Sequence, residues 1–328
     1  MTIADASHPQ TPASLHTLHG ETMGTSWCVK LVASLRADLH ALHAGIQAKL
    51  DRVVAQMSTW EAESDISRFN RSAAGTWHPL PEEFFSVFSC ALETARDSEG
   101  AYDPTIGPLV EAWGFGATQR GGRIPGDDEL ASAQARTGWR RMRLQPETAS
   151  GLQPGGVQLD FSAIAKGYGV DLVTRHLRDT GIAAALIEVG GELYGYGRKP
   201  DGTTWQVMVE ASPDAMADDE EVRVIALDGI AVATSGDHWH AFEQGGTRYS
   251  HTLDPRTGKP VEHASAAVTV IAEDAMHADA WATALTVMGA EAGYRFAQQR
   301  AIAARFVVRG GHGPIESMTD AFRMRLSA

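Results

Sequence analysis

From residue 185 onward, apolar segments of strand length follow one another mainly through turns and long excursions. They cover residues 185–189, 205–210, 222–227, 248–253, 266–272 and 305–308. A doubly wound parallel sheet instead needs a helix between successive strands. The sequence therefore predicts an α+β fold with mixed or antiparallel sheets and packed helices.

Helical periodicity marks other parts of the chain. A helix is predicted over residues 39–57, where apolar residues recur at spacings of three and four, namely Leu39, Leu42, Ile46, Leu50, Val53 and Met57. Similar spacings and end signals predict helices at residues 82–97, from just after Asp160 to residue 179, at 276–288 and at 291–299. A first strand is predicted at residues 26–33.

Less regular segments indicate the domain boundaries and the loops. Residues 1–20 are polar and non-periodic, which predicts a mobile N-terminal arm. Residues 21–328 then form a single domain, with either one lobe or two. Residues 116–129 are rich in glycine and polar residues, which indicates a surface loop. The acidic stretch 213–221 is interpreted as a solvated hairpin loop rather than a metal site.

Composition excludes several classes of protein. The chain has 328 residues, a formal net charge of −13 and 43% hydrophobic residues, which is typical of a globular protein with a large core. The negative charge argues against nonspecific binding of nucleic acid or acidic membranes. P-loop, Rossmann, HExxH and GxSxG motifs are absent from the sequence.

Cysteine content and the N-terminus bear on the compartment. Cys28 and Cys90 form no CxxC motif, which favours two free thiols and leaves a single disulfide open. The N-terminus lacks a basic segment and an apolar segment of the secretory type, and no apolar run is long enough for a membrane span. We therefore expect a cytoplasmic protein, with a trimmed export leader as the alternative.

Residues 160–171 combine a carboxylate, a turn of small residues and the start of a predicted helix. Asp160 precedes the turn, and Lys166 and Gly167 lie where the helix begins. A helix N-terminus with glycine and lysine nearby favours a bound phosphate. The alternative is an ordinary turn whose glycines serve packing.

Asp279 and Thr283 are four residues apart on a predicted helix, so their oxygens lie on one face. A carboxylate and a hydroxyl are hard ligands that suit Mg²⁺. The alternative is that Asp279 caps the helix and that Thr283 bonds back to the backbone.

His251 follows a predicted strand and precedes the Asp-Pro-Arg-Thr-Gly turn at residues 254–258. An imidazole there can act as a general base near neutral pH, and the alternative is a solvent-facing strand histidine. Residues 102–116 are rich in proline, glycine and aromatic side chains. They predict either a stacking surface for a flat ring or a packed loop.

The order of these blocks along the chain resembles the ApbE family, the FAD:protein FMN transferases. The matching blocks are residues 23–25, 58–60, 67–70, 102–105, 160–171, 188–192, 234–237, 251–258 and 279–283. The resemblance implies an ApbE-like, T-fold-like architecture. It also implies an enzyme that uses Mg²⁺ to transfer FMN from FAD to a threonine hydroxyl of a target flavoprotein, with release of AMP.

The resemblance further implies roles for individual residues. His251 matches the base for the acceptor hydroxyl. The implied metal site consists of Ala163, through its backbone carbonyl, with Asp279, Ala282 and Thr283. The implied contacts to FAD are Met23, Trp60, Ala101, Tyr102, Asp103, Asp160, Lys166 and Thr252.

Two other functions stay open at this point. One is a Mg²⁺-dependent FAD pyrophosphatase that yields FMN and AMP, and the other is a flavin-binding protein without turnover. The chain departs from the family pattern in lacking the export signal and lipid-bearing cysteine of many members. It also carries Gly169 where the family usually has alanine.

Overall fold

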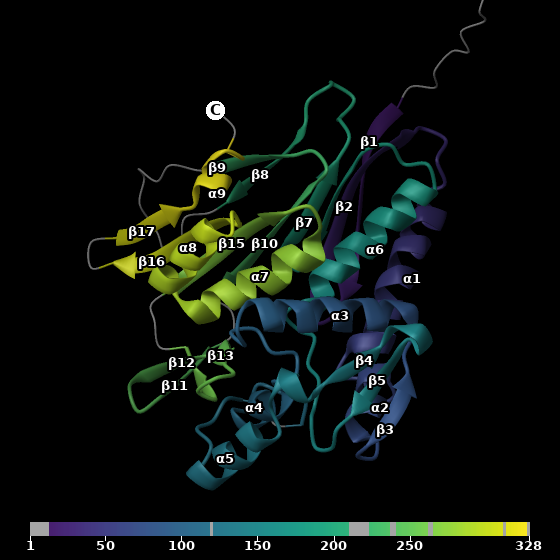
Figure 1. The fold of residues 1–328 in the computed structure, drawn as a ribbon. Coiled ribbons are helices and arrows are strands. Elements are labelled where there is room, and N and C mark those ends of the chain that lie inside the picture. The colour runs from purple at the N-terminus through teal and green to yellow at the C-terminus, as the bar shows by residue number, and fades with distance from the viewer. Residues whose placement is uncertain are drawn as a thin grey trace, which may run out of the picture.

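The computed structural model describes residues 13–118, 121–209, 223–236, 241–261, 265–310 and 313–326. Its main element is an antiparallel sheet in the order β1-β2-β6-β7-β10-β15-β16-β17 (Figure 1). These strands are β1 (Ala13–Thr22), β2 (Thr25–Ser34), β6 (Ala185–Val189), β7 (Glu192–Tyr196), β10 (Ile230–Gly236), β15 (Ser265–Ala272), β16 (Ala303–Gly310) and β17 (Gly313–Met318). The predicted α+β fold with antiparallel sheets is confirmed.

One face of this sheet is covered by helices (Figure 1). They are α1 (Leu39–Met57), α6 (Ala165–Asp179), α7 (Ala275–Met288) and α8 (Ala290–Gln299). Among the described residues, no helix has both the length and the apolar composition needed to cross a membrane.

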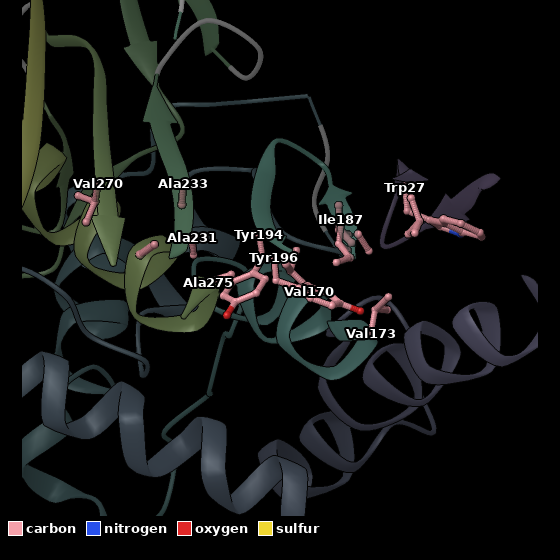
Figure 2. Packing of buried hydrophobic residues seen from close by; sticks show 14 of the residues in the cluster. Trp27, Val170, Val173, Ile187, Tyr194, Tyr196, Ala231, Ala233, Val270 and Ala275 are labelled. Carbon is pink, nitrogen blue, oxygen red and sulfur yellow. The ribbon is translucent and has the colours of Figure 1, made fainter. Parts of the chain in front are cut away.

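Side chains of β2 alternate between the two faces of the sheet, and its large apolar side chains lie on the face that the helices cover. Trp27, Val29 and Leu31 are buried on the helix side and lie opposite Val189, Ile187 and Ala185 of β6. Figure 2 shows Val170 and Val173 of α6 packing toward these strands, together with Tyr194, Tyr196 and Ala275. Side chains of period two on the sheet thus meet an apolar stripe of period 3.6 on each helix.

A smaller group of elements packs on the opposite face of the sheet. It consists of the ribbon β8 (Trp205–Val209) and β9 (Arg223–Leu227) and the short helix α9 (Asp320–Arg323). Trp205, Ile225, Leu227 and Phe322 are buried there with Val232 of β10. Burial on both faces explains why the central strands are apolar throughout.

A second group of elements packs below the helices, along α3 (Glu82–Asp97) (Figure 1). Phe84, Phe88 and Phe161 form its core with edge-to-face or tilted ring contacts of 5.2–6.2 Å between centroids. The other members are α2 (Asp65–Arg71) and the small sheet of β3 (Thr76–Pro79), β5 (Ser150–Gln153) and β4 (Arg143–Gln145), with 3-10 turns at Trp139–Arg141 and Pro146–Thr148. Met23 and Trp281 contact this core and the main core, so the two are continuous.

A third, smaller group lies beside the second. It contains α4 (Gly107–Ala112), α5 (Asp127–Ala135), the hairpin β11 (Ala241–Gln244) and β12 (Thr247–Ser250), and the pair β13 (Leu253–Asp254) and β14 (Lys259–Pro260). Leu109, Trp113 and Leu253 form its core. The Trp113 indole N–H donates to the carbonyl of Gly258 at 2.8 Å and ties the two halves of this group together.

Most of the predicted elements are present, and α1, α3 and β6 have the predicted bounds. The predicted arm at residues 1–20 is wrong for residues 13–20, because β1 pairs with β2 along its whole length. The predicted loop at 116–129 is wrong at its end, since α5 begins at Asp127, and the predicted strand at 248–253 is interrupted at His251 and Thr252. The acidic stretch 213–221 lies outside the described residues.

Candidate functional site

Helices α6 and α7 bring Asp279 to the beginning of α6. The backbone N–H of Gly167 donates to Oδ2 of Asp279 at 3.0 Å, and Oδ1 accepts no hydrogen bond within the described part of the chain. The side chain that caps α7 is Asp274, which accepts from the N–H of His277. The alternative in which Asp279 caps its own helix is therefore wrong.

The Asp279 carboxylate is held in a buried position. The residue is 4% exposed, and burial raises its pKa while the nearby Lys166 ammonium opposes that rise. This carboxylate occupies the α6 N-terminus, where the sequence alone suggested a phosphate. A phosphate there would have to lie beside the carboxylate rather than on the Gly167 N–H.

The other predicted metal ligands lie on α7 and in the turn before α6. Thr283 lies one helical turn after Asp279, and its hydroxyl forms no hydrogen bond among the described residues. By contrast, the Thr286 hydroxyl on the next turn donates to the carbonyl of Ala282 at 2.8 Å. Ala282 is buried, and Ala163 lies in the turn before α6.

Lys166 and Glu192 form a buried ion pair beside Asp279. The Lys166 ammonium donates to Oε1 of Glu192 at 2.5 Å, whereas Oε2 of Glu192 is buried and has no hydrogen-bond partner in the described part of the chain. Burial raises the pKa of Glu192 well above its usual value against the effect of Lys166, and Asp279 raises it further. For Lys166, burial lowers the pKa, but Asp279 and Glu192 outweigh burial and hold it above its usual value.

Two tight turns close around this pair. Met23, in the turn from β1 to β2, has a positive φ of 48° and contacts both cores. A Cβ on Gly190 would lie 2.7 Å from Cγ2 of Thr25 and 3.1 Å from Cδ of Lys166. Glycine at position 190 therefore allows the turns at residues 23–25 and 190–191 to meet at the beginning of α6.

The loop at residues 101–105 approaches the same place from the second core. Ala101, Tyr102 and Asp103 are buried, and the Tyr102 hydroxyl has no hydrogen-bond partner in the described structure. Burial raises the pKa of Tyr102 well above its usual value, and the nearby Cys90, Asp279 and Asp160 add to the rise. Tyr102 therefore links this loop to Asp279.

The two aspartates of this region serve the backbone. Oδ1 of Asp103 accepts from the N–H and hydroxyl of Thr105 at 2.8 and 2.6 Å, and Oδ2 accepts from the N–H of Trp139 at 3.1 Å. Oδ1 of Asp160 accepts from the N–H of Ser162 at 2.8 Å, and its own N–H donates to the carbonyl of Pro104. Both carboxylates thus shape the loops on which the site is built.

His251, Thr252 and Trp60 belong to other parts of the structure. His251 lies between β12 and β13, with its ring 6.4 Å from that of Phe115 in an edge-to-face contact. Thr252 is buried and donates its N–H to the Ser250 hydroxyl at 3.1 Å. Trp60 follows α1 and is 52% exposed. The structure therefore gathers Lys166, Glu192 and Asp279 into one group with Tyr102 nearby, whereas His251, Thr252 and Trp60 lie on other elements.

Comparison with known proteins identifies the family. A sequence model of the ApbE family matches residues 23–306. The chain belongs to the ApbE family. Its relatives include a protein of Vibrio cholerae named FAD:protein FMN transferase, 37% identical over 318 residues, which span 96% of this chain and 94% of the relative. A protein of the same name from Klebsiella pneumoniae is 33% identical over 322 residues, covering 97% and 91% of the two chains.

Solved structures agree with this assignment to the ApbE family. The flavinyl transferase ApbE of Pseudomonas stutzeri, in its apo form, superposes with a TM-score of 0.88 at 39% identity, over 96% of this chain and 98% of that one. The flavin transferase ApbE of Vibrio cholerae also gives a TM-score of 0.88, at 34% identity.

Two carboxylates of this ApbE protein received no role from the sequence. Glu192 was visible only as the end of the block at residues 188–192, although an acidic residue after two glycines was a usable signal. Asp171 accepts from the N–H groups of Ala275 and Met276, both at 2.9 Å. Nothing in the sequence marks that contact, because it joins positions 104 and 105 residues apart.

Glycine at position 167 should be required for the close approach of α6 and α7. A Cβ there would lie 2.6 Å from the carbonyl carbon of Ala275 and 2.9 Å from Cβ of Asp279. We expect Gly167→Ala to lower the free energy of unfolding by about 2–3 kcal/mol, as overpacking does. Gly169→Ala is the control, since its Cβ would meet only the ends of Leu50 and Met23, at 3.2 Å. Urea unfolding of both variants measures this difference, and equal losses would contradict it.

The cap of α7 should make stability depend on pH above neutrality. Hydrogen bonding to Asp274 raises the pKa of His277 to about 10. This contribution is complete below the unfolded pKa near 6.5 and is lost as the pH rises toward 10. Because both side chains are partly exposed, we expect a loss of only about 1 kcal/mol between these limits. Urea unfolding across this range should show that loss in the wild type and not in His277→Gln; parallel profiles would contradict it.

Proposed function

We propose that this protein transfers FMN from FAD to a threonine hydroxyl of an acceptor protein, with Mg²⁺, and releases AMP. Family membership and the names of relatives 33–37% identical over nearly the whole chain support the transfer of FMN to a protein. The observation that carries the proposal to this site is the buried group of Asp279, Lys166 and Glu192 where α6 meets α7. Cleavage of a pyrophosphate requires its negative charge to be neutralised by a cationic side chain and a metal ion, and this group offers the residues for each.

The donor set is compatible with Mg²⁺. Oδ1 of Asp279 and the hydroxyl of Thr283 are both without hydrogen bonds in the described structure, and each is a hard oxygen ligand. We propose that they hold Mg²⁺ with the Ala163 carbonyl, beside Ala282. No three His, Cys, Asp or Glu side chains gather into a metal cluster among the described residues. That agrees with Mg²⁺, which retains waters and takes phosphate oxygens as ligands. When bound, it would supply positive charge to the pyrophosphate.

Other residues of the protein would then bind and orient FAD. Lys166 would neutralise a phosphate, since its pKa is held above the usual value and it stays charged. The buried Tyr102 hydroxyl, which has no hydrogen-bond partner among the described residues, would donate to the bound nucleotide. Met23, Ala101 and Trp60 would contact FAD, as would Thr252, while Asp103 and Asp160 would hold the loops that receive it.

His251 is proposed to take the proton of the acceptor hydroxyl. The threonine oxygen forms a bond to the phosphorus of FMN, and the bond from that phosphorus to the AMP oxygen breaks. A base within hydrogen-bond reach contributes roughly 10²–10⁴-fold to such a step. His251 lies between the short strands β12 and β13, which are not part of the main sheet.

The test is to mix the purified protein with FAD and Mg²⁺, with and without a domain that carries a candidate acceptor threonine. Intact mass of the acceptor and chromatography of the nucleotides are followed. One FMN added to the acceptor, with AMP released, is the expected result. FMN and AMP without an adduct would favour a FAD pyrophosphatase, and FAD left intact would favour a flavin-binding protein. A cytoplasmic location stays a prediction from the sequence.

A further inference from the structure

Helices α6 and α7 cap each other. The Asp171 carboxylate of α6 accepts from the N–H groups of Ala275 and Met276 at the beginning of α7, both at 2.9 Å. In the other direction, the Asp279 carboxylate of α7 accepts from the N–H of Gly167 at the beginning of α6, at 3.0 Å. Each helix therefore supplies a negative charge to the N-terminus of the other, where free N–H groups and the helix dipole favour one.

The two contacts fix the helices at short range. The approach is so close that position 167 has no room for a Cβ. Asp171 lies four residues after Gly167, and Asp279 lies four residues after Ala275, about one helical turn in each case. The four residues thus form a closed clamp of two helical turns. Hereafter we call Asp171, Gly167, Ala275 and Asp279 the α6–α7 clamp.

The clamp determines where the proposed site residues lie relative to one another. Lys166 is adjacent to Gly167 on α6, while Thr283 follows Asp279 on α7. A shift of α7 along α6 would move Asp279 and Thr283 together away from Lys166. No hydrogen bond or ion pair joins Asp171 to these side chains in the described structure, so its effect on them acts through the position of α7.

We propose that Asp171 is a positioning residue, which holds α7 against α6 so that Asp279 and Thr283 stand beside Lys166. The expected effect of Asp171 on activity rests on the proposed function. Its expected effect on the clamp rests on the geometry of the two helices alone. Asp274 provides the matched control. It also caps α7, but its carboxylate bonds to the N–H and ring of His277 on the same helix and forms no hydrogen bond with α6 among the described residues, although its charge helps to raise the pKa of Asp171.

The experiment compares Asp171→Asn with Asp274→Asn at pH 8.5. Burial raises the pKa of Asp171 to about 7, so its carboxylate is ionised there. Asparagine keeps one acceptor oxygen and turns an N–H group toward the second donor, which breaks one of the two bonds. Hydrogen exchange of the peptide spanning residues 163–169 reports on the Gly167 N–H at the far side of the clamp. The Mg²⁺ concentration at half-maximal FAD conversion reports on the site.

We expect Asp171→Asn to speed exchange in residues 163–169 about tenfold, as loss of a charged cap does, and to raise the Mg²⁺ requirement by about the same factor. The rate at saturating Mg²⁺ should stay within about twofold of the wild type, because the ligands themselves are intact. Asp274→Asn should loosen only the first turn of α7. If Asp171→Asn does not fold, Asp171→Ser, whose hydroxyl accepts one bond, is measured with the same expectation.

Equal behaviour of the Asp171 and Asp274 variants in both measurements would overturn the proposal. Faster exchange with an unchanged Mg²⁺ requirement would also overturn it, since the clamp would then have no bearing on the site. If the wild type converts no FAD, the proposed function fails, and the exchange data still decide whether Asp171 and the Gly167 N–H are coupled.

Discussion

Asp279→Ala should reduce Mg²⁺-dependent conversion of FAD by at least about 10²-fold, the loss typical of removing one preorganised electrostatic group. The substitution removes the only proposed carboxylate ligand and leaves the Gly167 N–H without an acceptor. Turnover is measured by AMP release over a range of Mg²⁺ concentrations. We expect the loss to be only partly restored by high Mg²⁺, because Thr283 and a carbonyl cannot replace the charge.

Asp279→Asn separates catalysis from folding in this experiment. The amide oxygen still accepts from Gly167, so the contact between α6 and α7 is kept while the negative charge is lost. We expect near-wild-type stability with a loss of activity close to that of Asp279→Ala. The control on the same helix is Asp274→Ala, which removes a cap but no proposed ligand. Unchanged Mg²⁺ dependence in Asp279→Asn would show that the metal lies elsewhere.

His251→Ala should lower FMN transfer to the acceptor by roughly 10²–10⁴-fold, the usual contribution of a general base. FAD binding, followed by quenching of flavin fluorescence, should change little, because the proposed nucleotide contacts are mostly on other elements.

His16→Ala on β1 is the matched control for a partly buried strand histidine. It should transfer FMN at the wild-type rate. A His251 variant that loses FAD binding but transfers normally at saturating FAD would assign this residue to the binding site and remove it from the proton transfer.

The helices were predictable because their burial is regular. Along α1, Ile46, Leu50, Val53 and Met57 are buried at helical spacing, and the predicted bounds are those observed. Strand β1 shows the opposite case. It lies at the edge of the sheet, alternates only between half-buried and exposed positions, and is held by backbone pairing with β2, which polar residues such as Ser14 and Thr17 do not signal.

The candidate site was predictable residue by residue but not as a group. Lys166 and Asp279 stood out locally because their residue types suit a phosphate and a metal. Their association depends on a hydrogen bond across 112 residues and on the pairing of Lys166 with Glu192, which no local pattern records. Asp103 shows a different limit: the family resemblance implied a contact to FAD, and nothing in the sequence indicated that both of its oxygens accept hydrogen bonds from the backbone of Thr105 and Trp139.

The order of strands in the main sheet has a consequence for folding kinetics. The inner edge of β2 is paired only once β6 has formed, and the paired positions lie 154–162 residues apart in the sequence. The clamp needs α7, which follows β15 near the end of the chain. Contacts of such long sequence separation form slowly, because loop closure costs entropy before it is offset by packing. During synthesis, a nascent chain that already contains Lys166 would therefore lack the clamp, and with it the proposed FAD site, until the C-terminal third emerges from the ribosome.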